Sequence, residues 1–298
     1  MKKKILVTGA AGFIGRQLCD FLEKKKIPTI QVDDLSVKPV IKPSRKIIKM
    51  KVQDINSNFL KKNKIYKIIH LAAKKSVDES FYNLKNSIEN YEMNLNLLSA
   101  TVNSNVKHIY IASTCEIFGF QKKKLDEFSD YKPHSPYAVT KVANEYLSEI
   151  FTMRKKSLKI TSLIFFNTYG PTENIDAVIP KFVYLASKNR TIFIEGNGRQ
   201  KRNFNYISDA ISLIYKIIIS KKYFKKINIG GDKETSVIDI LEIIKNYFPN
   251  LRVKFKKGRI NEIQNFKCNN SLSRKHFKFD TKINLKNGIK KVIEFYNK

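Results

Sequence analysis

A glycine-spaced turn near the N-terminus constrains the fold of this chain more than any other feature. The segment TGAAGFIG (8–15) directly follows a short apolar, β-branched run (4–8) and opens a helical pattern. Gly9 permits a tight turn, Gly12 lets the backbone approach a pyrophosphate, and Gly15 lets the helix pack on the strand. The helix N-terminus then faces the negative charge. The residues expected to contact a dinucleotide at this turn are Gly9, Gly12, Phe13, Ile14 and Gly15.

The acidic end of the second predicted strand indicates which dinucleotide binds. Asp33 lies about 20 residues beyond the last glycine, where an acid is expected to bind the adenosine ribose hydroxyls. Asp34 follows it, and no Arg is adjacent. A 2′-phosphate would therefore meet two carboxylates, so the sequence favours NAD over NADP as the cofactor.

Short apolar segments alternate with helical patterns through the first half of the chain. The predicted strands are 4–8, 29–32, 46–50, 65–71, 108–112 and 159–166, and the helices between them are 13–25, 87–103 and 137–154. This alternation predicts an α/β fold with a doubly wound parallel sheet, the Rossmann arrangement. Later helices are expected at 177–188, 208–219, 237–247 and 285–297.

The domain organisation follows from where this alternation stops. After 166 the pattern loosens into a stretch rich in Gly, Pro and Asn, without a flexible linker. We expect a dinucleotide-binding domain over 1–166, with a later return near 204–230. Residues 167–203 and 231–298 are expected to form a smaller C-terminal α/β portion that binds the substrate.

The charge balance is strongly basic. The 298 residues include 57 Lys and Arg against 26 Asp and Glu, a formal net charge of +31, and 48 of the basic residues are Lys. A nucleic-acid groove would favour Arg and a clustered patch, whereas these lysines are spread along the whole chain. We therefore expect no nucleic-acid partner, although a field this positive attracts anionic substrates in general.

Cysteine and histidine usage gives no sign of a metal site. The three cysteines, Cys19, Cys115 and Cys268, form no CxxC pair, and the four histidines are scattered. A sparse, odd cysteine count is typical of a reducing cytosol. The apolar runs are also far shorter than the roughly 20 residues of a membrane-spanning helix. A cytoplasmic protein without a metal or a membrane segment is expected.

Tyr137 and Lys141 form the candidate catalytic pair. They are four residues apart on a predicted helix, so their side chains share one face. Lowering a tyrosine pKa from about 10 to about 7 needs about 4 kcal/mol, and one positive charge roughly 6 Å away supplies about 3 kcal/mol at an effective dielectric of about 20. Lys141 and a positively charged nicotinamide ring together could meet that need. Ser113 and Thr114 on the preceding strand complete the candidate constellation.

Five ordered segments give the chain a family resemblance. They are TGAAGFIG (8–15), IHLAAKKSVDES (69–80), ASTCEIFG (112–119), SPYAVTK (135–141) and NGRQKRNF (197–204). Together they resemble an extended short-chain dehydrogenase/reductase of the nucleotide-sugar epimerase/dehydratase family, over nearly the whole chain. The resemblance implies an NAD-dependent enzyme with a nucleotide-sugar substrate, which assembles as a homodimer through a four-helix interface.

The resemblance also implies roles for individual residues. Tyr137 would take a proton from a sugar hydroxyl while the adjacent carbon passes a hydride to NAD, giving a 4-keto sugar. Thr114 would hydrogen-bond the same oxygen, and Lys141 would orient the nicotinamide ribose and hold Tyr137 as a phenolate. The further cofactor contacts implied are Asp54, Ile55, Leu71, Ala72, Ala73, Lys74 and Asn94. The substrate contacts implied on the same side are Lys74, Ser113 and Thr114.

Cys115 and Glu116 bear on what happens to that 4-keto sugar. The family's dTDP-glucose dehydratases read S-T-D-E where this chain reads S-T-C-E, and their Asp protonates the leaving hydroxyl. A thiol with a pKa of about 8.5 is a much weaker proton donor than a carboxylic acid. The glutamate of that pattern is present here as Glu116, and in those enzymes it removes the C5 proton. The S-T-x-E pattern also resembles GDP-mannose dehydratases and UDP-glucuronate decarboxylases.

Three residues are implied in binding the substrate's diphosphate. Asn167 in FFNTYGP, Arg202 in NGRQKRNF and Arg259 in KGRINE match family positions, and a guanidinium makes bidentate, charge-assisted bonds to a pyrophosphate. The chain departs from the family pattern nearby. Ile164 stands where an Arg is usual, Asn203 replaces the common Asp after Arg202, and Phe118 replaces the common Tyr before Gly119.

The sequence therefore predicts a nucleotide-sugar 4-epimerase, with a UDP-sugar as the preferred substrate. The short path from Gly170-Pro171 to Ile179-Pro180 is more typical of 4-epimerases than of decarboxylases. A 4,6-dehydratase, a UDP-glucuronate-type decarboxylase and a 4-keto reductase stay open as alternatives. A non-catalytic dinucleotide- or RNA-binding protein is the alternative from a different class, and the intact Thr114, Tyr137 and Lys141 disfavour it.

Overall fold

The computed structural model describes residues 3–41, 46–258 and 263–297. Contacts within the chain divide it into two compact units. Unit 1 comprises 1–119, 130–164 and 214–227, and unit 2 comprises 120–129, 165–213 and 228–298.

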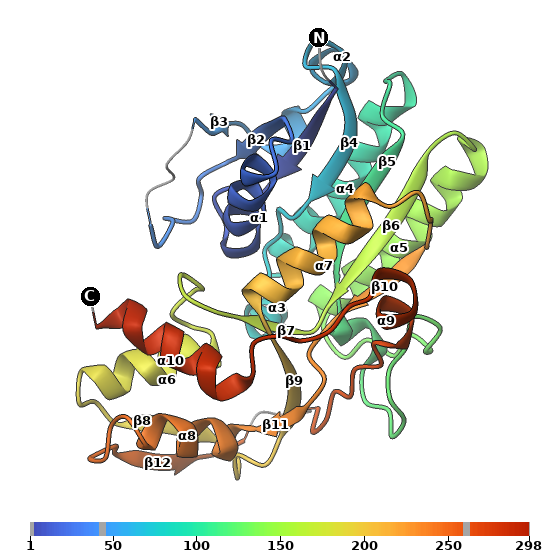
Figure 1. The fold of residues 1–298 in the computed structure, drawn as a ribbon. Helices are drawn as coiled ribbons and strands as arrows, with labels where there is room; N and C mark the ends of the chain where they lie inside the picture. The colour runs from blue at the N-terminus through green and yellow to red at the C-terminus, as the bar shows by residue number, and fades with distance from the viewer. Residues whose placement is uncertain (1–2, 42–45, 259–262, 298) are drawn as a thin grey trace. The chain divides into compact units, whose positions relative to one another are not determined.

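Unit 1 is built from alternating strands and helices (Figure 1). Its elements are β1 (Lys4–Thr8), α1 (Phe13–Lys24), β2 (Thr29–Asp33), β3 (Ile48–Lys49), η1 (Val52–Asp54), α2 (Ser57–Lys62), β4 (Ile65–His70), α3 (Val77–Tyr82), α4 (Leu84–Val102), β5 (His108–Thr114), η2 (Cys115–Phe118), α5 (Pro136–Arg154) and β6 (Lys159–Phe165). The helix α7 (Ile207–Ile219) and the strand β10 (Lys226–Ile229) contribute residues to both units.

A seven-stranded parallel sheet forms the centre of this fold. Its strand order is β10-β6-β5-β4-β1-β2-β3, so the chain moves outward in one direction from β1 and then in the other from β4. Parallel strands bring their carboxyl ends to one edge, and ligands bind where the strand order reverses. Here that point is between β1 and β4, whose last residues are joined by a bond of 2.7 Å between Thr8 Oγ1 and His70 Nδ1. The doubly wound sheet predicted from the sequence is confirmed.

Helices cover both faces of the sheet (Figure 1), with α1 and α7 on one face and α4 and α5 on the other. On the first face, the rings of Phe21 and Tyr215 pack 5.2 Å apart. On the second, Leu97 and Leu98 of α4 join Leu6 and Ile68 of the strands in one buried apolar cluster. Burying near-continuous aliphatic strands between two helical layers is what a parallel sheet requires.

Unit 2 contains shorter strands and four further helices among its described residues. Its elements are β7 (Asn167–Tyr169), α6 (Val178–Ser187), β8 (Ile192–Glu195), β9 (Lys201–Tyr206), β11 (Glu234–Ser236), α8 (Val237–Lys245), β12 (Val253–Lys256), α9 (Ser271–Phe277) and α10 (Leu285–Tyr296). The strands form a three-stranded sheet, β11-β9-β7, and a two-stranded sheet, β12-β8. The ring of Tyr169 packs against those of Phe204 and Tyr206 of the first of these.

Most predicted elements agree with the structure to within a few residues, and two predicted strands differ more. The run 46–50 yields only the two-residue strand β3, while β5 extends past 112 to Thr114. Residues 120–129 were included in the first predicted domain but belong to unit 2. Backbone bonds explain their place there, because Leu125 N donates to Lys267 O at 2.6 Å and its own O accepts from Asn228 Nδ2 at 2.9 Å.

Three absences concern the described residues only. No helix among them is long and apolar enough to cross a membrane. Within the same residues, no group of three or more His, Cys, Asp or Glu side chains is arranged to hold a metal ion. The three cysteines, all within the described ranges, are buried and form no disulfide.

Candidate active site

The glycine turn between β1 and α1 leaves no room for side chains at two of its three glycines. Gly9 has a φ of +67°, and a Cβ there would lie 2.6 Å from Ala72 N. A Cβ on Gly15 would lie 2.0 Å from Gly9 O. Gly12 differs, because its Cβ would meet only Gly9 O at 3.2 Å and the residue is exposed. Backbone atoms therefore pack tightly against Gly9 and Gly15, whereas Gly12 is open to solvent. A pyrophosphate approaches the turn at Gly12.

Asp33 fixes this turn from the end of β2. One carboxylate oxygen accepts a hydrogen bond from Ala11 N at 2.9 Å, and the other accepts from Leu35 N at 2.8 Å. Each oxygen keeps a lone pair for a further donor such as a ribose hydroxyl. Among the described residues, no side chain caps the N-terminus of α1 at Gly12, so its backbone N–H groups are available to an anion. The residues present therefore fit an NAD molecule.

Lys74 joins two loops at this end of the sheet. Its Nζ donates to Ser36 Oγ at 2.9 Å and lies 4.0 Å from Asp34 Oδ2. Although burial opposes the effect, hydrogen bonds from Ser36 and the charge of Lys74 hold the pKa of Asp34 below its ordinary value. Asn90 of α4 fixes the Lys74 backbone with two bonds, Lys74 N to Asn90 Oδ1 at 2.8 Å and Asn90 Nδ2 to Lys74 O at 2.9 Å. The sequence reasoning missed Asn90, which has no motif of its own.

The other predicted cofactor residues differ in how far they are exposed. The half-exposed ones are Phe13, Ile14, Leu71, Ala72 and Ala73. Asp54 is exposed at the end of η1, whereas Ile55 belongs to the buried apolar cluster and its carbonyl oxygen accepts from Asn96 Nδ2 at 2.9 Å. Asn94 is buried and donates from Nδ2 to Asn144 O at 3.5 Å, which joins α4 to α5.

Tyr137 and Lys141 share one face of α5, as the spacing predicts. The helix begins with Ser135 as its N-cap, whose hydroxyl accepts from Ala138 N at 3.1 Å, and Tyr137 therefore lies in the first turn. Lys141 Nζ stands 5.8 Å from the centre of the Tyr137 ring and donates to Ala112 O at 2.9 Å. Both side chains are more than nine-tenths buried.

The charges of the chain act on Tyr137 in the direction opposite to the one expected. Burial raises the pKa of the Tyr137 phenol, the charges of Glu116 and Cys115 raise it further, and a hydrogen bond from Thr114 only partly offsets them. Burial also lowers the pKa of Lys141 to about 8, against the charge of Glu145. The expectation that Lys141 depresses the tyrosine pKa was incomplete, because the sequence could not show how deeply the pair is buried or that Glu116 faces it.

The residues Ser113–Glu116 lie beside this pair at the carboxyl end of β5. Thr114 Oγ1 hydrogen-bonds the Tyr137 side chain and also accepts from Glu116 N at 3.3 Å, which begins the η2 turn. Cys115 and Glu116 are both close enough to act on Tyr137 through their charges. The structure thus brings all five predicted catalytic residues together within unit 1. A buried phenol, an ammonium group and a hydroxyl beside a dinucleotide turn can move a proton to and from a substrate hydroxyl.

Two predicted diphosphate-binding residues lie in unit 2, and Arg259 falls outside the described residues. Asn167 begins β7 and is half-buried. Arg202 of β9 stacks its guanidinium 5.1 Å from the centre of the Phe266 ring and donates from Nη1 to Lys201 O at 3.0 Å. These contacts hold the arginine side chain in one orientation.

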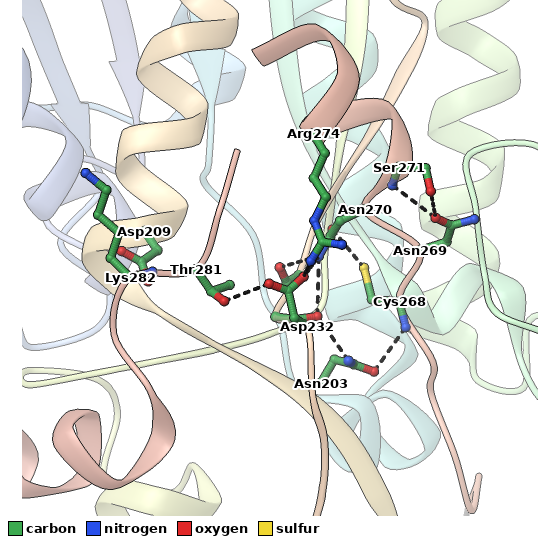
Figure 2. A network of polar contacts seen from close by, with 12 residues as sticks. Asn203, Asp209, Asp232, Cys268, Asn269, Asn270, Ser271, Arg274, Thr281 and Lys282 are labelled. Carbon is green, nitrogen blue, oxygen red and sulfur yellow. Dashed lines mark hydrogen bonds and ion pairs between the residues drawn. The ribbon is translucent and has the colours of Figure 1, made fainter. Parts of the chain in front are cut away.

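Asn203 departs from the family pattern for a reason visible in Figure 2. Its amide Nδ2 donates to Gly231 O at 3.0 Å, and its Oδ1 accepts from Cys268 N at 3.0 Å. A carboxylate has no N–H and could make only the second of these bonds. Asn203 is 2% exposed and therefore fastens β9 to the segments on either side.

The same network continues through Asn270, which donates to Gly230 O at 3.0 Å and to Asp232 Oδ1 at 3.1 Å (Figure 2). Asp232 also pairs with Arg274 at 2.6 Å and accepts from Thr281 at 2.7 Å. These bonds tie α9 and the chain that follows it to the end of β10, so the network supports unit 2 structurally.

Comparison with known proteins identifies the family of the chain. The family model described as "NAD dependent epimerase/dehydratase family" matches residues 5–230. An uncharacterized UDP-glucose epimerase, YtcB of Bacillus subtilis, is 32% identical over 82% of this chain and 81% of its own.

Two solved structures resemble almost the whole chain. TunA, an NAD-dependent NDP-hexosamine 5,6-dehydratase of tunicamycin biosynthesis, is 29% identical with a TM-score of 0.94, over 99% of this chain and 97% of its own. The UDP-glucuronic acid 4-epimerase of Bacillus cereus, in complex with UDP-glucuronic acid and NAD, is 25% identical with a TM-score of 0.92, over 99% of each chain.

Proposed function

Because the chain belongs to the NAD-dependent epimerase/dehydratase family, we propose that it is a nucleotide-sugar 4-epimerase that acts on a UDP-sugar through a transient 4-keto intermediate. The observation that carries the proposal is the arrangement of Thr114, Tyr137 and Lys141, which serves oxidation at a sugar hydroxyl. The thiol of Cys115, where a dehydratase has a carboxylic acid, favours an outcome without loss of water. Similarity to the UDP-sugar epimerases described above also supports it.

In this proposal the chain's own residues move the proton. Tyr137 takes the proton of the C4 hydroxyl, and Thr114 holds the phenol oxygen in place. Lys141 Nζ lies 5.8 Å from the centre of the Tyr137 ring, so its positive charge is placed to favour the phenolate. NAD, when bound, supplies hydride acceptance and return together with a positively charged ring. Tyr137 then gives the proton back to the C4 oxygen, and C4 now has the opposite configuration.

A dehydratase is the second candidate, and Glu116 favours it. The Glu116 carboxylate is near enough to Tyr137 to raise its pKa, so a base stands beside the oxidation site. Elimination of water across C5 and C6 needs such a base to remove the C5 proton. The resemblance to TunA, over 99% of the chain, supports this candidate too. In that case Cys115, or the phenol of Tyr137, would have to protonate the leaving hydroxyl.

Turnover of a panel of UDP-, dTDP-, GDP- and CDP-sugars in heavy water distinguishes the two candidates. A 4-epimerase never breaks the C5–H bond, so we expect a C4 epimer with no deuterium on carbon and no loss of water. The products would be identified by mass spectrometry and proton NMR. A dehydrated sugar with deuterium introduced from solvent would refute the epimerase proposal and assign the C5 proton to Glu116. If no UDP-sugar in the panel reacts, the proposed 4-epimerase activity is wrong.

The diphosphate of the substrate is proposed to bind Asn167, Arg202 and Arg259. The held guanidinium of Arg202 supports this, since an oriented arginine loses little conformational freedom when it binds a phosphate. We also propose a cytoplasmic location, because the three buried cysteines form no disulfide within the described ranges, which is typical of a reducing compartment.

Apolar side chains exposed on α4 and α5 support a homodimer. They recur at helical spacing and so form one face on each helix: Leu84, Ile88, Leu95 and Val102 on α4, and Val139, Tyr146, Ile150 and Met153 on α5. Contiguous apolar patches of this kind mark interaction surfaces, and a second copy of the chain would cover both faces.

The variant Ile150→Asp is expected to abolish this dimer. Ile150 is 61% exposed, so the substitution should leave the fold of the single chain intact while it places a charge in the interface. Sedimentation velocity of the wild type should give a dimer and that of the variant a monomer. Phe128→Asp, at an exposed position in unit 2, is the control and should stay dimeric. A dimer that persists in Ile150→Asp would place the interface elsewhere.

A further inference from the structure

Glu145 is a buried carboxylate that the proposed reaction does not use. It lies on α5 one helical turn beyond Lys141, and only 9% of its surface is exposed. Ser113 Oγ donates to its Oε1, and the Tyr131 hydroxyl donates to its Oε2. An ionised carboxylate only accepts hydrogen bonds, so two donors on its two oxygens stabilise the charged form.

These bonds connect the two elements that carry the catalytic groups. Ser113 immediately precedes Thr114 at the end of β5, while Glu145 belongs to the helix that presents Tyr137 and Lys141. The bond from Lys141 Nζ to Ala112 O, 2.9 Å long, joins the same strand and helix one turn earlier. A shift of β5 along α5 would break both connections at once.

The surroundings of Glu145 give it two positive neighbours. Lys226 Nζ stands 4.8 Å from the centre of the Tyr131 ring and 3.3 Å from its hydroxyl oxygen. Burial raises the pKa of Glu145, while the bonds from Ser113 and Tyr131 and the charges of Lys226 and Lys141 oppose that rise. The influence is mutual, because the charge of Glu145 opposes the fall that burial imposes on the pKa of Lys141.

We propose that Glu145 is a positioning residue for the catalytic pair: its carboxylate fixes β5 against α5 through Ser113 and keeps the buried Lys141 ammonium charged. The proposal rests on the function proposed above for Tyr137 and Lys141. This role explains why a carboxylate is buried at position 145. Burying a carboxylate carries a desolvation cost that an apolar side chain would not have.

The other titratable groups around Lys141 do not replace this charge. His70 on β4 is close enough to feel Lys141, but burial and that charge lower its pKa to about 3, so it is neutral in any assay near pH 7. Tyr137 contributes no negative charge until it ionises, and its pKa is raised. Around Glu145 itself, Tyr131 is a neutral donor whose pKa is also raised, by burial first and then by Glu145, Tyr146 and Glu149.

The test is the titration of Lys141 in wild type and in Glu145→Gln. Charges one helical turn apart, about 6 Å, interact by roughly one to two pH units at an effective dielectric of about 20. Removing the negative neighbour disfavours the ammonium, so the pKa of Lys141 should fall by that amount. Lysine resonances in ¹³C-lysine-labelled protein report it directly, with Lys141→Arg to assign the signal. The alkaline limb of kcat against pH should move down with it, with KM unchanged.

Glu149→Gln is the matched control. Glu149 lies one turn further along α5, its side chain is 40% exposed, and it pairs with the more exposed Lys225 at 2.6 Å. Removing its charge should change neither the Lys141 resonance nor the pH profile, because Lys225 and solvent screen this charge. A Lys141 titration that is the same in Glu145→Gln and wild type would overturn the proposal.

A second variant tests the hydrogen bond between Ser113 and Glu145 separately. It also provides a test of the proposal if Glu145→Gln fails to fold. Ser113→Ala removes one bond to the carboxylate and keeps its charge, so kcat should fall by about 3- to 10-fold without a lower alkaline limb. An unchanged kcat would contradict the positioning role. The lysine titration needs no turnover, so it distinguishes failure of this inference from failure of the proposed function, which would appear as an inactive wild type.

Discussion

Replacing Tyr137 by Phe is expected to lower kcat by a factor of about 100 or more, the usual scale for a positioned acid–base group. The phenol oxygen is the only part of the side chain removed, and its bond with Thr114 contributes about 1 kcal/mol to stability. The fold and NAD binding should therefore persist. Steady-state kinetics with the best sugar of the panel, together with NAD binding by calorimetry, check both parts of this expectation.

Tyr146→Phe provides the control on the same helix. Tyr146 is exposed, about two and a half turns beyond Tyr137, so loss of its hydroxyl should leave kcat unchanged. If Tyr137→Phe retained the wild-type rate, the proton would be moved by another group, and the catalytic assignment of α5 would have to be withdrawn.

Gly15→Ala is expected to abolish NAD binding and to lower the melting temperature. The new methyl group would lie 2.0 Å from Gly9 O, against backbone that no rotamer change can move. Overpacking of this kind costs about 1–3 kcal/mol and sometimes more. Relief requires β1 and α1 to separate, which pulls Gly9 away from the conformation that shapes the turn. Differential scanning calorimetry and NAD titration measure the two effects.

Gly12→Ala separates cofactor binding from folding. Gly12 has a φ of −68°, and its Cβ would meet only Gly9 O at 3.2 Å, so the melting temperature should change little. The methyl group would nevertheless stand where a pyrophosphate approaches, and NAD affinity should fall. Equal melting temperatures for Gly15→Ala and wild type would show that the turn opens more easily than its contacts indicate.

The strands and helices of unit 1 could mostly be predicted because local pattern and tertiary role agree in them. β1 begins and ends where its apolar run does, and α1 begins after Gly12 and ends within one residue of the predicted bound. The strands of unit 2 could not be predicted in this way. β7 is three residues of mixed polarity, and its partner β9 begins more than thirty residues later, at Lys201. Nothing in the local sequence of either strand indicates that pairing.

The site residues that could be predicted are those marked by their spacing in the sequence. Those whose role depends on burial could not be predicted. Tyr137 and Lys141 stand out because a four-residue spacing on a helix places them together. Glu145 has the same spacing from Lys141, yet an acidic residue on a helix is usually solvated, and only the structure shows it buried beneath Ser113. The direction of the pKa shift of Tyr137 was missed for the same reason, since desolvation is the largest cause.

The paired bonds of Asn203 restrict how this position can change in related chains. The amide needs an acceptor on one side, Gly231 O, and a donor on the other, Cys268 N. Asp at position 203 would place a carboxylate oxygen against the carbonyl oxygen of Gly231, and the two would repel each other. Asp is therefore expected at this position only where the segment around 231 also differs. Grafting β9 from a relative that carries Asp therefore requires grafting the segments around 231 and 268 as well, because the residue at 203 bonds to both of them.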